Sequence, residues 1–111
     1  MNVKQLSEWP EINCLCLSDT ERPITSVYIG DLLSWVMGRA PADSAWITIM
    51  SNANVAAVAT LADTACVILA ENVQPDAQLL STAESKGINL LSSPLTAYQL
   101  AVRLAKQIEN A

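Results

Sequence analysis

Residues 45–70 read AWITIMSNANVAAVATLADTACVILA, and this stretch decides the fold. It opens with an apolar run at 45–50 and closes with another at 66–70, and the small residues at 54–61 have the pattern of a helix. Two strand-like runs joined by a helix are typical of a β–α–β unit, in which the strands are parallel. The second run is apolar on both faces, which predicts a central strand covered by helices on both sides.

The same alternation continues on both sides of this stretch. Downstream, INLL at 88–91 predicts a third strand, and Pro75 and Pro94 are placed as first-turn prolines of two further helices. Upstream, INCLCL predicts a strand, and an extended segment leads to a helix that we expect to begin at Asp31 or Gly30. The helices that we expect span 3–9, 31–39, 54–61, 75–85 and 94–109.

The chain of 111 residues has the typical size of one domain, and we expect residues 1–111 to form a single domain. A domain of this size buries roughly 65% of the surface that its unfolded chain exposes, which is enough for a core without disulfide bonds or metal ions. The predicted fold class is α/β, with three layers in which helices cover both faces of a mostly parallel β-sheet.

The composition excludes several functions. Six Lys and Arg residues and a net charge of −5 leave no basic stripe for nucleic acid. No apolar run approaches the roughly 18 residues that span a bilayer, and the first residues lack the order of a signal peptide, so we expect a cytoplasmic protein without a membrane partner. Because 51% of the residues are hydrophobic and 15% are charged, we expect a homo-oligomer that covers part of the apolar surface.

The residue types give little support for enzymatic chemistry. The chain has no histidine, which excludes Ser–His, Cys–His and His–metal arrangements. It has three glycines and neither of the common glycine-rich phosphate-binding motifs. Cys14, Cys16 and Cys66 lie in apolar runs and are expected to pack; on a regular strand Cys14 and Cys16 share a face, where a disulfide would be strained. We therefore expect no catalytic residue, metal ion or cofactor.

The first candidate site is the loop Ser51–Asn54, which leads from a strand into a helix. Parallel sheets bind ligands at the carboxyl ends of their strands, and the free N–H groups of the helix N-terminus would hold an anion there. The alternative is that one polar residue of the loop only caps the helix.

The second candidate is the segment 22–31, which combines a guanidinium, two hydroxyls, a phenol and a carboxylate. Such a cluster would bind a nucleotide or a phosphate. The alternative is a surface turn in which Arg22 is solvated and Asp31 favours the helix N-terminus. An enzyme that uses Asp31 or Thr48 as a hydrolase or transferase is a third, weaker hypothesis. Over both segments, the residues expected to bind a ligand are Thr25, Ser26, Asp31, Thr48, Ser51, Asn52 and Asn54.

Large and small apolar residues suggest where surfaces pack. Trp9, Trp35 and Trp46 are expected to be anchors of the core or of an interface. The alanine-rich helix at 54–61 is expected to pack closely against the sheet or a second copy. The helix at 31–39 is expected to bury one apolar stripe, formed by Leu32, Leu33, Val36 and Met37.

Three stretches of the sequence, RPITSVYIGDLLSWVMGRA, AWITIMSNANVAAVATLADTACVILAE and PDAQLLSTAESKGINLLSS, resemble the DRTGG domain family over nearly the whole chain. The resemblance is carried by the Asp-Leu-Leu-Ser stretch, the Trp-Ile-Thr strand, an Asn-containing loop before Ala-Val-Ala, and the Pro-Asp helix that ends before Gly-Ile. The chain departs from the family at the Thr-Gly-Gly turn, which here reads Thr25-Ser26-Val27. A β-branched Val27 resists the positive φ that glycine permits, so this turn is a poor cradle for phosphate.

The resemblance implies a fold like the N-terminal domain of HPr kinase. It also implies a regulatory, dimerising role like that of the stand-alone DRTGG domains of bacteria. Related domains occur beside CBS domains in nucleotide-regulated family II pyrophosphatases. They also occur in the N-terminal part of some phosphotransacetylases. In neither case does the domain contain the catalytic site. We therefore expect a non-catalytic regulatory or assembly module that homodimerises or docks on a metabolic or redox enzyme. The alternative is a sensor that binds an adenine nucleotide or a phosphorylated metabolite at the carboxyl edge of the sheet.

Overall fold

The computed structural model describes residues 1–110, which form a sheet with helices packed on it. Within these residues, no helix is both long and apolar enough to cross a lipid bilayer. In chain order the elements are α1 (Val3–Ser7), β1 (Asn13–Cys16), β2 (Ser26–Ile29), α2 (Leu33–Arg39), β3 (Ser44–Thr48), α3 (Asn54–Ala62), β4 (Cys66–Leu69), α4 (Ala77–Lys86), β5 (Leu90–Ser92) and α5 (Ala97–Glu109).

The sheet has the strand order β1-β5-β4-β3-β2. Strands β2 to β5 are parallel and step across the sheet in chain order, and β1 pairs antiparallel with β5 at one edge. A bulge interrupts β1 between Cys14 and Cys16. The prediction of a mostly parallel sheet is confirmed.

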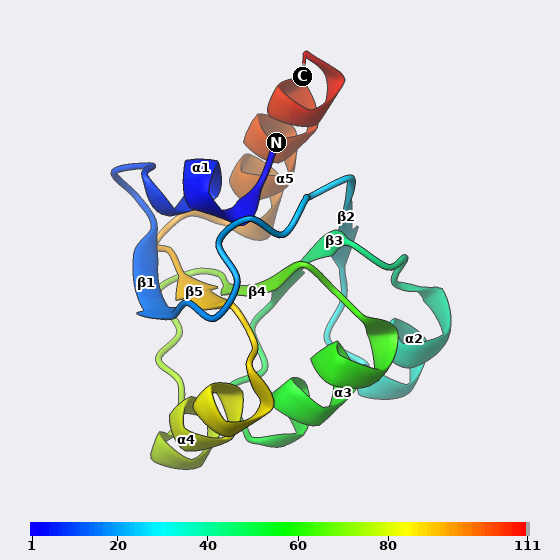
Figure 1. The fold of residues 1–111 in the computed structure, drawn as a ribbon, viewed down its shortest axis with the longest axis vertical. Coiled ribbons are helices and arrows are strands. Elements are labelled where there is room, and N and C mark those ends of the chain that lie inside the picture. The colour runs from blue at the N-terminus through cyan, green and yellow to red at the C-terminus, as the bar shows by residue number, and fades with distance from the viewer. Residues whose placement is uncertain (111) are drawn as a thin grey trace.

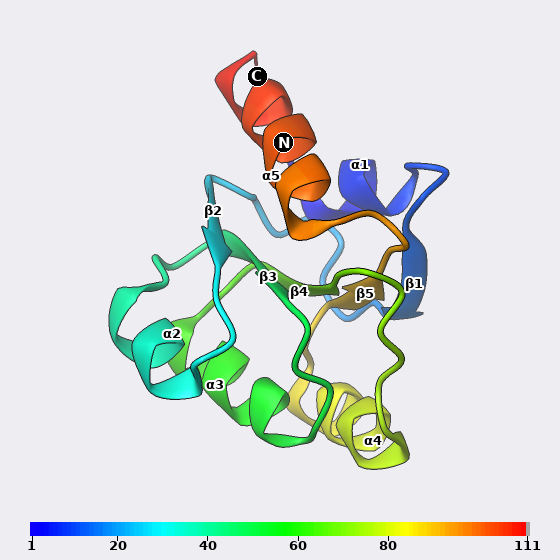
Figure 2. The same ribbon diagram turned by 180° about the vertical axis from the view of Figure 1, so that it is seen from behind.

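Helices cover both faces of the sheet, as predicted (Figures 1 and 2). Parallel strands are joined by right-handed crossovers, and each crossover here steps in the same direction, so the three connecting helices α2, α3 and α4 lie on one face. The other face is covered by α1 and α5, which come from the two ends of the chain and lie side by side in both views. The layers are therefore two helices, the sheet and three helices.

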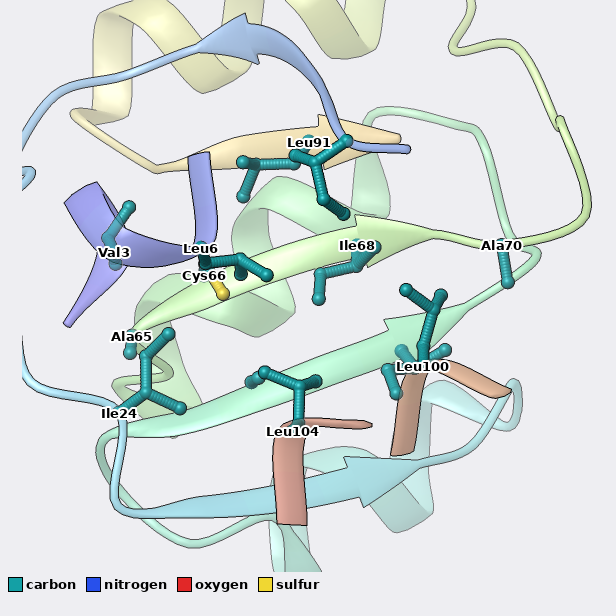
Figure 3. Close-up of a cluster of buried hydrophobic side chains, with 13 residues drawn as sticks. Val3, Leu6, Ile24, Ala65, Cys66, Ile68, Ala70, Leu91, Leu100 and Leu104 are labelled. Carbon is teal, nitrogen blue, oxygen red and sulfur yellow. The ribbon is translucent and has the colours of Figure 1, made fainter. Parts of the chain in front are cut away.

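The central strands divide their side chains between two apolar clusters. In β4, Cys66 and Ile68 point toward α1 and α5, whereas Val67 and Leu69 point toward α3 and α4. Figure 3 shows the first cluster, in which Leu6 of α1 and Leu100 and Leu104 of α5 cover the sheet. The second cluster packs against the opposite face and contains Val36, Trp46, Val55, Ala56, Val58, Ala59, Val67, Leu69, Leu79, Ala83, Ile88 and Leu90.

Several helix boundaries differ from the sequence-based prediction. Helix α4 begins at Ala77 rather than Pro75, because the Asp76 carboxylate caps it by accepting a hydrogen bond from the Leu79 amide at 2.7 Å. Helix α5 begins at Ala97 rather than Pro94, because Thr96 and Gln99 form a capping box. In both helices a polar capping side chain, and not a first-turn proline, determines the first residue of the helix.

Helix α2 differs most from the prediction. It begins at Leu33 rather than Asp31 or Gly30, and its expected apolar stripe is only partly buried. Val36 is fully buried against the sheet, but Leu32 and Met37 are exposed. The reason is its position beside β2, at the end of the sheet, where no further strand or helix of residues 1–110 covers its outer side.

Candidate functional site

Asp31 follows β2 and Thr48 is the last residue of the neighbouring strand β3, so the two meet at the carboxyl edge of the sheet. The Asp31 carboxylate accepts hydrogen bonds from the Thr48 hydroxyl at 2.8 Å and from the Ile49 amide at 2.9 Å. Thr48 is only 2% exposed, whereas Asp31 is exposed. Asp31 therefore connects the loop after β2 to the loop after β3. The sequence predicted that it would lie at the first turn of α2, and this prediction is wrong.

A second bond joins the same two strands. The indole N–H of Trp46, which is fully buried, donates to the carbonyl of Gly30 at 2.9 Å. A Cβ at position 30 would lie 2.8 Å from the Tyr28 ring, so a larger residue here would require that ring to shift. Trp46 is the core anchor that the sequence predicts.

The loop Ser51–Asn54 is closed on itself. The Asn52 side chain accepts from the Asn54 amide at 2.9 Å, and the Asn52 carbonyl accepts from the Val55 amide at 3.1 Å. The Ala56 amide donates to Ala53 at 3.1 Å. Ala53 already has helical backbone angles (φ −60°, ψ −23°) and no capping side chain, so the Asn52 side chain caps this end of the helix by accepting from the Asn54 amide, as the alternative interpretation predicts. An anion at this end of α3 would have to replace these bonds.

Thr25 and Ser26 lie at the opposite ends of the strands, where the parallel strands begin, which we call the amino edge. Both stand at the start of β2, where the Thr25 amide donates to the Asp43 carbonyl at 2.9 Å and Ser26 aligns with Ser44. Five candidate residues therefore gather at the carboxyl edge and two at the amino edge. The five are Asp31, Thr48, Ser51, Asn52 and Asn54.

Arg22 is ion-paired and only 25% exposed, which corrects the expectation of a free surface side chain. Its Nε lies 2.6 Å from the Asp43 carboxylate, and one Nη donates to the carboxylate and carbonyl of Asp63 at 2.9 and 2.7 Å. Burial opposes the charge of Arg22, but the hydrogen bonds to Asp43 and Asp63 outweigh it and raise the pKa of the guanidinium. The sequence signal was weak, because aspartates at positive φ such as these are ordinary turn residues.

A cavity of about 240 Å³ lies beside this cluster at the amino edge. Arg22 and Lys86 line it together with Asp19 and Asp63, so its positive and negative side chains balance. The Asn89 side chain, which also lines it, already bonds four backbone groups, namely the Ser18 and Asp19 amides and the Asp19 and Ala65 carbonyls. The cavity therefore has no excess positive charge with which to hold a phosphate.

The bulge in β1 separates the two neighbouring cysteines. Cys14 pairs with Leu91 and Cys16 with Leu90, and because Leu91 and Leu90 face opposite sides of the sheet, the two thiols do so too. This corrects the expectation that they share a face, and Cys14 is exposed rather than packed. Burial raises the pKa of the Cys66 thiol to about 12. Among residues 1–110, no three Cys, Asp or Glu residues gather to hold a metal ion.

The most distinctive exposed feature is an apolar surface on α2 and the residue before it, which we call the α2 surface. Each of its large side chains is between 47 and 57% exposed. The Arg39 guanidinium lies over the Trp35 ring, 3.7 Å from its centroid. The members of the α2 surface are Leu32, Trp35 and Met37. Ile29 is also exposed, but it aligns with Ile47 of the first cluster and therefore faces the α5 side of the sheet.

A comparison with protein-family models agrees with the resemblance seen in the sequence. The family model described as the DRTGG domain matches residues 14–107 of the 111-residue chain. The search of curated proteins finds no match.

Proposed function

Because the chain belongs to the DRTGG domain family, which is regulatory, we propose that it is a non-catalytic regulatory module that works as a homodimer through the α2 surface. The carrying observation is that Leu32, just before α2, and Trp35 and Met37 of α2 are left about half-exposed at one end of the sheet. Clustered exposed apolar residues mark interaction sites, whereas single ones are normal on any surface.

The energetic scale is suitable for association. Fully burying one large apolar side chain contributes about 1.5–3 kcal/mol, so burying the exposed half contributes about 1 kcal/mol. Three such side chains from each of two copies contribute about 6 kcal/mol, which lies within the association cost of about 4–15 kcal/mol. A single substitution in the α2 surface is therefore expected to weaken the dimer measurably.

The arrangement of the polar candidates supports a role without catalysis. The Thr48 hydroxyl is buried, donates to Asp31 and accepts from the Met50 amide at 3.1 Å. Because Thr48 is only 2% exposed, a substrate has little access to its hydroxyl. These residues hold two loops together.

Light scattering of the purified protein over a range of concentrations tests the proposal. The wild-type chain is expected to have the mass of a dimer, and Trp35→Glu is expected to have the mass of a monomer at the same concentration. Tyr98→Glu is the matched control, because Tyr98 is also exposed and aromatic but lies on α5, away from the α2 surface. A monomeric wild-type chain, or a Trp35→Glu variant that dimerises like the control, contradicts the proposal.

Docking on a metabolic or redox enzyme would use the same surface, and a folded but monomeric wild-type chain would favour it.

The sensor hypothesis has a separate test, which is thermal unfolding with adenine nucleotides and phosphorylated metabolites. A ligand at about a hundred times its dissociation constant contributes about 2.7 kcal/mol and raises the midpoint by several degrees. A shift that is lost in Asn54→Ala would support binding at the carboxyl edge.

A further inference from the structure

Strand β2 has one open edge. It pairs with β3 on one side, and within residues 1–110 the backbone of Ser26–Ile29 makes no hydrogen bond outside that pairing. Its residues are partly or fully exposed, whereas those of β3, β4 and β5 are buried. In a parallel pair, alternate residues of an edge strand leave their N–H and C=O groups free to pair with another strand.

The two edges of the sheet differ in how they are protected. Edge strands usually carry a proline, a charged residue or a bulge, any of which prevents pairing with another chain. Strand β1 has such a bulge between Cys14 and Cys16. Strand β2 reads SVYI and has none of these features. The β2 edge is therefore the one that is suited to pairing.

Charge favours a second copy as the occupant of this edge. The chain has a net charge of −5, so an interface between two copies costs least where the surface carries few charges. In residues 23–38 only Asp31 is charged, and its carboxylate is held by Thr48 and the Ile49 amide. The surface beside β2 therefore presents no charge that would select a basic or acidic partner over an identical copy.

We propose that the β2 strands of two copies pair antiparallel across a two-fold axis perpendicular to the sheet, so that the two five-stranded sheets become one continuous sheet. This inference rests on the proposed homodimer and specifies how it forms. A two-fold axis in this direction keeps both α2 helices on the same face of the joined sheet. The two helices, each beside β2, then lie next to each other. We expect this to cover Leu32 and Trp35, which are exposed in a single copy.

Hydrogen exchange measured by mass spectrometry tests the strand pairing. The wild-type chain is compared at a concentration where light scattering shows the dimer and after dilution to the monomer. The amides of Ser26–Ile29 are expected to exchange at least about tenfold more slowly in the dimer, because half of them gain a partner. Strand β1 is the internal reference, since it is also an edge strand but is expected to change little.

Two variants complete the test. Ile29→Lys is expected to give a monomer with unprotected β2 amides at both concentrations. Leu61→Lys makes the same change at an exposed leucine of α3 and is expected to behave as wild type. A dimer whose β2 amides are not protected overturns the strand pairing and leaves the homodimer standing, whereas a wild-type monomer at every concentration overturns both.

Discussion

Replacing Asp31 with alanine distinguishes a structural tie from a ligand-binding carboxylate. The substitution removes the acceptor for the Thr48 hydroxyl and for the Ile49 amide. Ile49 is exposed, so water can replace the lost partner of its amide. Thr48 is 2% exposed, so its hydroxyl loses its acceptor in a place where water has little access.

The magnitude follows from that burial. An unsatisfied buried donor costs about 1–3 kcal/mol, and we expect Asp31→Ala to lower the free energy of unfolding by about 2 kcal/mol. The unfolding entropy of about 2.1 cal/mol/K per residue amounts to about 0.23 kcal/mol/K for 111 residues. The melting midpoint should therefore fall by about 9 °C.

Urea unfolding of four proteins provides the assay: wild type, Asp31→Ala, Thr48→Val and the double variant. We expect Asp31→Ala to cost less in the Thr48→Val background, because the donor that it orphans is already gone. Glu84→Ala is the charge control, since Glu84 is exposed on α4 and makes no ion pair within residues 1–110. The reasoning is refuted if Asp31→Ala costs no more than Glu84→Ala, or if its cost is the same in both backgrounds.

Other regions of the molecule give three further predictions. The Cys66 thiol should react with a thiol reagent at pH 8 only as fast as the chain unfolds, whereas the other two thiols react rapidly; fast labelling of all three would contradict the buried position and the raised pKa of Cys66. Arg22→Met should lower the urea-unfolding free energy by about 1–2 kcal/mol, because it breaks both contacts to Asp43 and Asp63, and a loss below that of Asp63→Asn would contradict this. The Arg103 guanidinium lies 2.9 Å from the Glu11 carboxylate and holds the pKa of Glu11 below its usual value. The stability that this ion pair contributes is therefore present above the unfolded-state pKa of Glu11 and is lost as pH falls through its folded-state pKa. Glu11→Gln should show a shallower loss of stability below about pH 5, and an unchanged pH profile would contradict this.

The sequence was sufficient to predict the layers and the core. Continuous apolar runs at 45–50 and 66–70 predict buried parallel strands, and both are central strands of the sheet. Helix starts were predicted two or three residues too early where prolines were used, because Asp76 and Thr96 are stronger start signals. These are errors of boundary and leave the type of each element unchanged.

The arrangement of the candidate site residues could be predicted only in part. Placing Thr48 and the Ser51–Asn54 loop at the carboxyl edge follows from strand direction, which the alternation of strands and helices determines. The bond between Asp31 and Thr48 joins residues 17 positions apart and depends on how the loop after β2 turns. Arg22 and Asp63 are 41 positions apart, and their contact depends on the full strand order.

The amino-acid sequence by itself determined the class of the fold, the two-sided core and the absence of histidine-based chemistry, because periodicity and residue type are local properties. The tertiary structure decided which polar residues share an edge, and it placed Cys14 and Cys16 on opposite faces through a single bulge. It also left the α2 surface exposed beside the open edge of β2. These outcomes depend on strand order and register, which arise from contacts between distant parts of the chain and have no signature in a local pattern.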